Sequence, residues 1–308
     1  MDSKAKKKSG MNPGTKLFLV ALPFFVLYFL FSYLPVRGWI YSFYDYKPGI
    51  PLSQTEFVGV ENFVKMFVNP IKRREFIQVM ENTLFFAIAG VATSFLPMFF
   101  AILLNELPFA WLRKLVQTCT TIPHFIGWVL VYALAFSMFS SQGFVSQILM
   151  NLGIWEQGKN MMTMESFPRI QMWLYGNWKG IGWSAIIYLA SLGSIDQELY
   201  EAAEVDGAGR FAKIRYITIP GLLPTFITLL IMSIGNFLSV GMEQFKVFSN
   251  AFNTDYITVL DLYVYNQGLV NQDISYSTAI GIYKSVIGLI LLCLANWISG
   301  KVREEKIF

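Results

Sequence analysis

The residues best placed to do chemistry are two lysines and one histidine inside long apolar stretches. Lys179 falls within residues 173–192, Lys284 falls within residues 277–298, and His124 is the only histidine of the chain. An ammonium group in an apolar environment is costly and usually faces a cavity or a partner. We therefore expect each lysine either to bind an anionic ligand or to be satisfied by snorkelling, by backbone carbonyls or by acids of a partner subunit.

Enzymatic chemistry has little support. A single histidine argues against a His-based metal centre and against a Ser-His-Asp triad. Because His124 follows Pro123, it is expected to mark a helix kink where the imidazole satisfies freed backbone groups, with a substrate contact as the alternative. Cys119 and Cys293 form no C-x-x-C pair and are expected to be small buried hydrophobes. No phosphate-binding glycine motif occurs, so we expect no nucleotide site in this chain.

The composition indicates a protein that crosses a membrane several times. Hydrophobic residues make up 55% of the chain and charged residues 14%, against about 25% charged in soluble proteins. The net charge is only +4, and the basic residues are scattered, so nucleic acid is not an expected partner.

Six apolar stretches could position these residues, because each approaches the roughly 20 residues needed to cross a bilayer. They are residues 17–35, 83–104, 116–139, 173–192, 216–240 and 277–298. Lys and Arg are almost three times denser in the termini and alternate loops than in the other loops, which predicts that both termini are cytoplasmic. The basic run 72–74 lies on the opposite side, in a long loop where the charge rule is weak.

The loop over residues 194–224 carries the clearest pattern. Ser194 and Gln197 have capping-box spacing, which predicts a helix over residues 195–206. Gly207 fits a helix stop, and Ala202 leaves a low surface that another backbone could approach. From the residues alone, an ordinary surface helix and a helix that docks in another protein's groove are equally compatible.

The same loop resembles a family motif. EAAEVDGAGRF followed by ITIPGLLP is similar to the EAA loop of binding-protein-dependent ABC importer permeases, which reads E-A-A, three residues, G, then about nine residues to I-x-L-P. Matching positions are Glu201, Ala202, Ala203, Asp206, Gly207, Ala208, Ile217 and Pro220; Ile219 replaces the usual leucine. Stretches such as NWKGIGWSAIIYLAS look like maltose-type sugar permeases, closest to the polysaccharide and oligosaccharide branch, and the first 16 residues lie outside the match.

The resemblance implies an all-α polytopic membrane protein with six transmembrane helices, the type I ABC importer permease fold and a cytoplasmic coupling helix. It implies a permease domain over residues 17–308, in the bacterial cytoplasmic membrane; the basic residues before this domain predict a cytoplasmic tail over residues 1–16. The implied partners are a second, non-identical permease subunit, two ATP-binding subunits, an extracytoplasmic solute-binding protein, the sugar substrate and membrane lipid. The chain itself would be no enzyme and would hold no cofactor, since ATP and Mg would bind the partner ATPase.

Carried over by position, two sets of site residues follow from the resemblance. The ATPase-coupling set is Glu201, Ala202, Ala203, Asp206 and Gly207. The substrate-binding set is Asn177, Lys179, Gly180 and Trp183, together with Ser233, Asn236 and Phe237. Because the predicted spans contain two lysines and no acidic residue, we expect an acidic, uronate-bearing oligosaccharide; paired or snorkelling lysines are the alternative.

Two other function classes fit the sequence less well. An ion-coupled secondary transporter working without an ATPase would be expected to have buried carboxylates or an inverted repeat, and the predicted spans show neither. An intramembrane enzyme would need a catalytic constellation that one histidine and no span carboxylate do not supply.

Overall fold

The computed structural model describes residues 12–163 and 167–303. Most of the predicted basic tail, residues 1–11, lies outside the described residues. Within them the chain is helical, and extended pairing is limited to an isolated bridge between Tyr44 and Phe57. The all-α fold class expected from the sequence is therefore confirmed.

The helices follow one another with short connections. In chain order they are α1 (Pro13–Tyr28), η1 (Phe29–Tyr33), η2 (Leu34–Phe43), η3 (Leu52–Gln54), α2 (Glu61–Val68), α3 (Pro70–Ala92), α4 (Leu96–Asn105), α5 (Ala110–Phe125), α6 (Trp128–Phe139), α7 (Phe144–Asn151), η4 (Met161–Thr163), α8 (Pro168–Leu192), α9 (Gln197–Val205), α10 (Arg210–Lys213), η5 (Ile214–Thr218), α11 (Ile219–Gly235), α12 (Glu243–Phe248), α13 (Thr254–Ile257), α14 (Leu260–Tyr265), η6 (Asn266–Val270) and α15 (Ile274–Arg303).

Five helical stretches of the described chain are long and apolar enough to cross a membrane. They are Gly14–Phe43, Pro70–Asn105, Trp128–Asn151, Arg210–Gly235 and Ile274–Lys301. The predicted stretch 173–192 falls in α8, which has 25 residues and is long enough to span, although glycines and polar residues lower its hydropathy. The six-helix expectation agrees approximately with this set.

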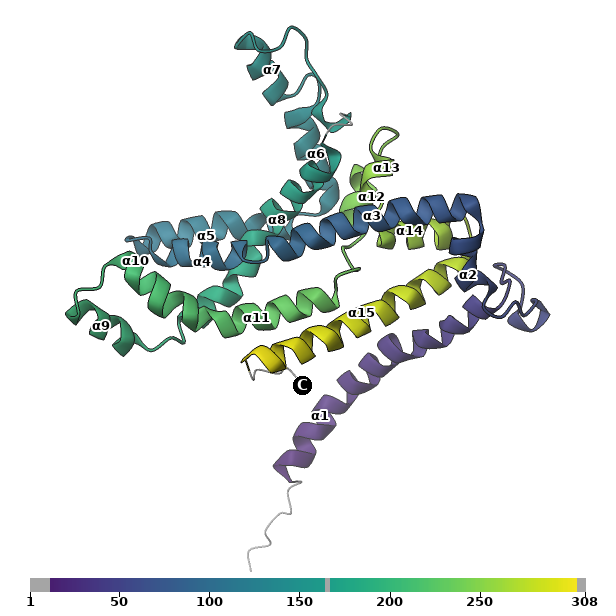
Figure 1. Ribbon diagram of the computed structural model, residues 1–308, viewed down its shortest axis with the longest axis horizontal. Coiled ribbons are helices and arrows are strands. Elements are labelled where there is room, and N and C mark those ends of the chain that lie inside the picture. Colours follow the sequence, from purple (N-terminus) through teal and green to yellow (C-terminus); the bar gives the residue numbers. More distant parts are fainter. Residues whose placement is uncertain (1–11, 164–166, 304–308) are drawn as a thin grey trace, which may run out of the picture.

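One predicted span is divided in the structure. Residues 116–139 fall on α5 and α6, because Ile126 and Gly127 both adopt extended backbone angles between them. In Figure 1, α6 and α7 project away from the other helices, whereas α5 lies along α4. A continuous apolar run could not reveal this turn, since its only local signal is Gly127 shortly after Pro123.

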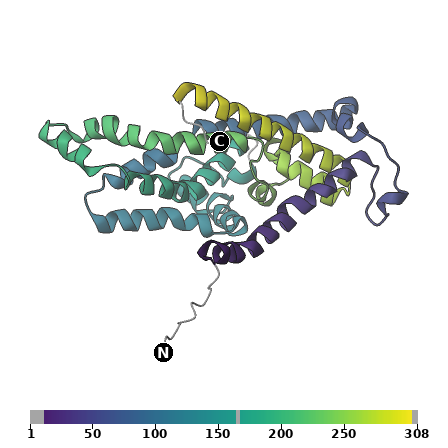
Figure 2. The same ribbon diagram turned by 90° about the horizontal axis from the view of Figure 1, so that it is seen from below.

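The helices pack closely where glycine removes a side chain. A Cβ at Gly182 of α8 would lie 2.2 Å from the carbonyl oxygen of Thr120 on α5. A Cβ at Gly288 of α15 would lie 3.1 Å from the carbonyl oxygen of Gly235, the last residue of α11. Figures 1 and 2 both show α11 and α15 running side by side. These two crossings fix α8 against α5 and α11 against α15.

The two ends of the molecule carry different segments. Figure 1 shows α9 at one end and α2 at the other, with α1 diverging from the remaining helices below α15. Near the α9 end, a buried cluster of Ala101, Ile102, Ala185, Tyr188, Leu192 and Leu222 joins α4, α8 and α11, and Ile195 packs against it. The loop that carries the family motif therefore rests directly on the packed spans.

Both cysteines differ from expectation. Cys119 and Cys293 are exposed free thiols rather than buried hydrophobes. An apolar surrounding sequence predicts burial in a soluble protein, but in a membrane-spanning helix it equally suits a face turned outward from the helix bundle.

Candidate coupling surface and transport pathway

Helix α9 begins differently from the predicted capping box. Asp196 is the N-cap, and its carboxylate accepts a hydrogen bond from the Glu198 backbone N–H at 3.0 Å. The Ser194 hydroxyl instead donates to the carbonyl oxygen of Ser191 at 2.7 Å. The capping-box prediction was therefore wrong, because Asp196 and not Ser194 caps the helix. The helix starts at Gln197, since an aspartate nearer to the first turn accepts from the same free N–H groups.

The predicted end of α9 is present. Gly207 has φ +76°, the left-handed conformation that glycine adopts without a Cβ clash. The N–H of Ala208 donates to the Ala203 carbonyl at 2.8 Å, and the N–H of Gly207 donates to the Glu204 carbonyl at 3.0 Å. These two bonds form a Schellman motif, which stops the helix and turns the chain toward α10.

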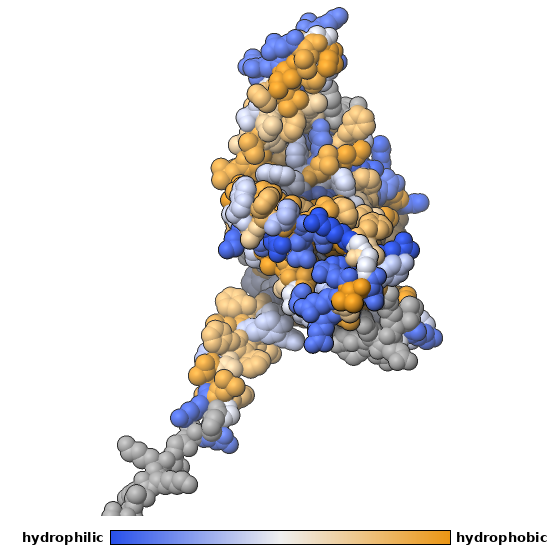
Figure 3. Space-filling view, turned by 90° about the vertical axis from the view of Figure 1, so that its left-hand side faces the viewer, coloured by the Kyte–Doolittle hydropathy of each residue, from blue (hydrophilic) through white to orange (hydrophobic). Residues whose placement is uncertain are grey.

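The surface of α9 is open along its whole length. None of its residues is buried, and Val205 retains 89% of its exposure. Glu201, Ala202, Asp206 and Gly207 of the predicted coupling set are exposed, and Ala203 is half-buried. Figure 3, which faces the end of the molecule where α9 lies, shows hydrophilic side chains gathered there with hydrophobic residues among them. Ile195, the first residue of the predicted helix 195–206, lies outside α9 and packs inward.

Three contacts tie the loop to the start of the next span. The Tyr200 hydroxyl lies 3.0 Å from the Thr218 hydroxyl, and Lys213 pairs with Glu204 at 2.5 Å. The hydrogen bond from Lys213 and its positive charge lower the pKa of the Glu204 carboxyl below its ordinary value. A Cβ at Gly221 would lie 2.6 Å from the Ile195 side chain, so this part of α11 directly supports the loop.

Helix α11 continues the loop without a break. The backbone stays helical from Arg210 to Gly235, through a single π turn over Ile214–Thr218. At 1.5 Å per residue, this stretch is about 39 Å long. A displacement of the α9–α10 segment would therefore be transmitted along one continuous helix.

The predicted substrate residues on α8 form one local group. Lys179 Nζ donates to the His124 carbonyl at 2.5 Å and lies 5.4 Å from the centre of the Trp128 ring. The imidazole of His124 stacks on Trp183 at 4.5 Å with an interplanar angle of 3°, and Trp183 stays 45% exposed. The backbone group near Pro123 is thus satisfied by Lys179, not by the imidazole as predicted.

The two remaining α8 positions differ in character. Asn177 donates to the Trp173 carbonyl of its own helix at 2.9 Å. Gly180 has open space where a Cβ would lie, so it is not required for packing.

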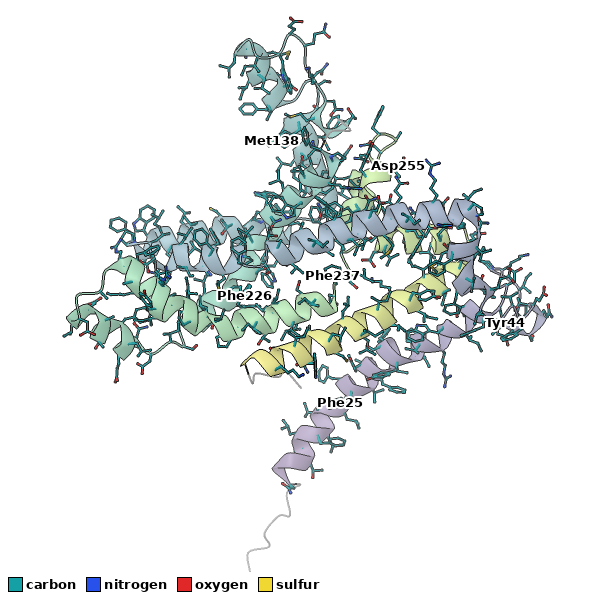
Figure 4. All side chains as sticks on the ribbon, in the orientation of Figure 1. Phe25, Tyr44, Met138, Phe226, Phe237 and Asp255 are labelled. Atoms are coloured by element: carbon teal, nitrogen blue, oxygen red, sulfur yellow. The ribbon has the colours of Figure 1, made fainter. Side chains whose placement is uncertain are left out.

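The predicted substrate residues near α11 lie at the end of that helix. The helix ends at Gly235, not at residue 240, so Ser233 is helical whereas Asn236 and Phe237 follow it. Asn236 lines a cavity of about 620 Å³. Phe237 instead packs against a buried cluster that includes Val79 of α3, and Figure 4 shows it between α11 and α3.

Lys284 has a partner that the sequence did not reveal. Its ammonium group pairs with the carboxylate of Asp261 on α14, and both side chains are largely shielded, with 22% and 18% exposure. The predicted spans contain no acidic residue, but an acid from another segment of the same chain, rather than a ligand or a partner subunit, pairs with Lys284. Asp261 lies in a segment predicted to be outside the spans, and only the folded chain brings it to α15.

The substrate residues predicted on α8 and those predicted near α11 do not line one common cavity. Asn236 shares its cavity with Ser239, Asp261 and Lys284, whereas none of the α8 residues lines that cavity. Across the described residues, no group of three or more His, Cys, Asp and Glu side chains could hold a metal ion.

Comparison with known proteins identifies the family. Residues 94–304 match the family described as the binding-protein-dependent transport system inner membrane component. The chain belongs to that family. The permease is also similar over most of its length to proteins of Bacillus subtilis (strain 168). It is 38% identical to Protein LplB over 295 residues, which are 95% of this chain and 91% of that protein.

Further relatives cover the permease almost completely. It is 37% identical to the polygalacturonan/rhamnogalacturonan transport system permease protein YteP of Bacillus subtilis (strain 168), over 95% of this chain and 90% of that protein. It also resembles the crystal structure of a bacterial ABC transporter involved in the import of the acidic polysaccharide alginate, with a TM-score of 0.82, 30% identity and coverage of 94% of this chain and 96% of that chain. The permease fold is therefore that of an ABC importer.

Proposed function

We propose that this permease is a transmembrane subunit of an ATP-driven importer of acidic oligosaccharides. It works with a second, non-identical permease subunit, two ATP-binding subunits that hold ATP and Mg, and an extracytoplasmic solute-binding protein. Exposed α9, which carries the EAA residues and joins α11 directly, is the observation that supports coupling to a separate ATPase. A match at 29% identity to an alginate ABC transporter in complex with a pentasaccharide-bound periplasmic protein supports the binding-protein partner.

The proposed coupling uses the shape and attachments of α9. Ala202 keeps the exposed surface low, which lets a groove of the ATPase approach the helix backbone. Movement of that groove displaces α9, and the Tyr200–Thr218 and Glu204–Lys213 contacts pass the displacement to the beginning of the long helix Arg210–Gly235. The permease then alternates between inward-facing and outward-facing states without hydrolysing ATP itself.

The acidic substrate class has two supports. Relatives named for polygalacturonan/rhamnogalacturonan and alginate handle uronate-bearing chains. On α8, Lys179 forms no ion pair with an acidic residue of the described chain, and exposed Trp183 offers a flat face on which a sugar ring can stack. Lys284 does not support an acidic substrate, because the Asp261 carboxylate neutralises its charge.

The membrane orientation is part of the proposal. The positive-inside distribution places both termini and the α9 loop in the cytoplasm of a bacterium, with the permease crossing its cytoplasmic membrane. The opposite end of the molecule, where α2 lies, would then face the binding protein.

ATP hydrolysis by the complete reconstituted transporter tests the proposal. The assembly would be measured with binding protein loaded with an oligogalacturonate, with the carboxyl-reduced neutral oligosaccharide, and without ligand. We expect hydrolysis to rise only with the acidic ligand. A rise with the neutral ligand alone would overturn the substrate class, and uptake driven by an ion gradient without ATP would overturn the importer itself.

A further inference from the structure

Besides the packing of Phe237 and Leu238 against a buried cluster, the linker that follows α11 is held by one acidic side chain. Residues 236–242 connect α11 to α12 without regular helix. The N–H of Gly241 donates to one carboxylate oxygen of Asp261 at 2.9 Å, and the other oxygen pairs with Lys284. Asp261 therefore joins three segments that are distant in the sequence: the linker, α14 and α15.

Asp261 stands next to a buried, hydrogen-bonded part of the fold. The N–H of Leu260 donates to the Thr83 hydroxyl of α3 at 2.8 Å, and Val259 and Leu260 are buried. This anchors the first turn of α14, where Asp261 lies, to α3. The carboxylate thus forms a fixed point to which the linker and Lys284 attach.

The linker connects α11, which continues from the coupling loop, to α12, which is held by packing against other helices. Helix α12 is held by the Gln244 side chain, which donates to the Met172 carbonyl at 2.6 Å, and by buried Phe245 and Phe248. Helix α11 instead continues directly from the coupling loop. Relative motion of these two helices must be absorbed between them, and Gly241, with φ +91°, supplies the flexible residue.

The same linker forms one wall of the cavity of about 620 Å³. Asn236 and Ser239 contribute polar groups from the linker, and Asp261 and Lys284 contribute polar groups from α14 and α15. Movement of the linker would therefore change the shape and polarity of this cavity.

We propose that Asp261 is a positioning residue for transport, which clamps the linker 236–242 to Lys284 and must release it for α11 to complete its movement. This inference rests on the proposed function, because it requires α11 to move with an ATPase. It adds to that function the element that keeps the far end of α11 in place between transport events.

The clamp can be tested directly by measuring how accessible the linker is. Cys119 and Cys293, both exposed, would be changed to serine, and Leu238, which is buried in the linker, would be changed to cysteine as a maleimide reporter in the complete transporter in nanodiscs. Asp261→Leu removes both contacts, and Asp45→Leu removes one partner of an exposed surface pair as the matched control. We expect the labelling rate to rise about 5- to 30-fold in Asp261→Leu only, the population change produced by losing a contact or two of this kind.

ATP hydrolysis provides a second measurement, which would not change if Asp261 had only a structural role. We expect Asp261→Leu to raise hydrolysis without binding protein and to reduce the stimulation that loaded binding protein gives. Unchanged labelling together with unchanged stimulation in the assembled variant would overturn the proposal. If wild-type hydrolysis ignores the binding protein, the proposed function fails, whereas the labelling comparison still decides whether Asp261 clamps the linker.

Two further variants keep the test decisive if Asp261→Leu does not assemble. Asp261→Asn retains an acceptor for the Gly241 N–H but loses the ion pair, so we expect the labelling rate to rise above that of wild type, and an unchanged rate would overturn the role of the Lys284 pair. The exchange Asp261→Lys with Lys284→Asp restores the charge pair but leaves Gly241 without its acceptor, because an ammonium group only donates. Full rescue by this exchange would overturn the role assigned to the Gly241 contact.

Discussion

The proposed coupling loop and the cavity beside α15 are built in opposite ways. The features that define α9 lie within a dozen consecutive residues: the Asp196 cap, the low alanine surface and the Gly207 stop. The cavity is assembled from three separated segments, and its central contacts join Gly241, Asp261 and Lys284. A surface that docks on another protein can be encoded locally, whereas a polar cavity between spans depends on the packing of the whole bundle.

The largest effect expected concerns the local side of this comparison. Gly207→Val places a β-branched residue at φ +76°, which L side chains rarely adopt, so the turn after α9 must change. We expect binding-protein-stimulated ATP hydrolysis to fall about tenfold or more, since the left-handed conformation alone costs roughly 1–2 kcal/mol. Gly209→Val is the matched control, because Gly209 has φ −70° and equally open space. Equal losses in both variants would show that loop bulk, not turn geometry, matters.

A substitution on α8 tests whether the substrate contacts α8 as well as the cavity between α11 and α15. Trp183→Ala removes the ring that stacks on His124 and is partly exposed. Aromatic stacking contributes about 0.5–1.5 kcal/mol, so we expect a several-fold rise in the KM for oligosaccharide uptake. The transporter should still assemble, and loaded binding protein should still stimulate its ATP hydrolysis. Trp183→Phe should recover most of the affinity. Normal uptake kinetics in Trp183→Ala would leave the α11–α15 cavity as the better candidate for sugar contact.

A packing variant measures how strongly the distant contacts depend on the bundle. Gly182→Ala places a Cβ against the Thr120 backbone, and overpacking of this kind costs roughly 1–3 kcal/mol. We expect a lower midpoint in thermal unfolding of the purified complex. Gly180→Ala, two residues away with open space at its Cβ, should leave the midpoint unchanged. Tolerance of both substitutions would mean that the α5–α8 crossing adapts easily.

The smallest effect is expected at the pair between Glu204 of α9 and Lys213 of α10. Glu204→Gln removes the negative charge of this pair but keeps an oxygen that can accept from Lys213, and Glu204 is exposed, so stimulated hydrolysis should change by less than about twofold. The folded pKa of Glu204 is lowered, so the pair persists above the ordinary carboxyl pKa and is lost as the pH falls through the folded value. Wild type and Glu204→Gln should therefore converge at acidic pH; a gap that widens there would contradict this assignment.

The sequence predicted helix α9 because its signals are local. The EAA residues, the helix over about three turns and the Gly207 stop required only neighbouring positions. The predicted N-cap failed by two residues, since Ser194 and Asp196 were both plausible caps and only the fold selects between them.

Long-range pairings and helix breaks were beyond the sequence pattern. The apolar run 116–139 reads as one span, although two extended residues divide it into α5 and α6. Lys284 looked unpaired because its acid, Asp261, lies 23 residues earlier in a segment assigned outside the spans. Hydropathy reports where a chain can enter a membrane, and it contains no information on which polar groups meet inside.

The position of the α11–α15 crossing has a mechanical consequence. Because Gly235 ends the continuous helix, nearly all of its length of about 39 Å lies on the coupling side of the crossing with Gly288. If α9 moves with a partner ATPase as proposed, the helix would act as a lever with one long arm and one very short arm. A shift of about 5 Å at α9 corresponds to a rotation of only about 7° at this length. At the short arm of such a lever the displacement is smaller and the force is larger than at the long arm. A modest force applied at α9 would therefore act on the Asp261 contacts as a larger force over a shorter distance.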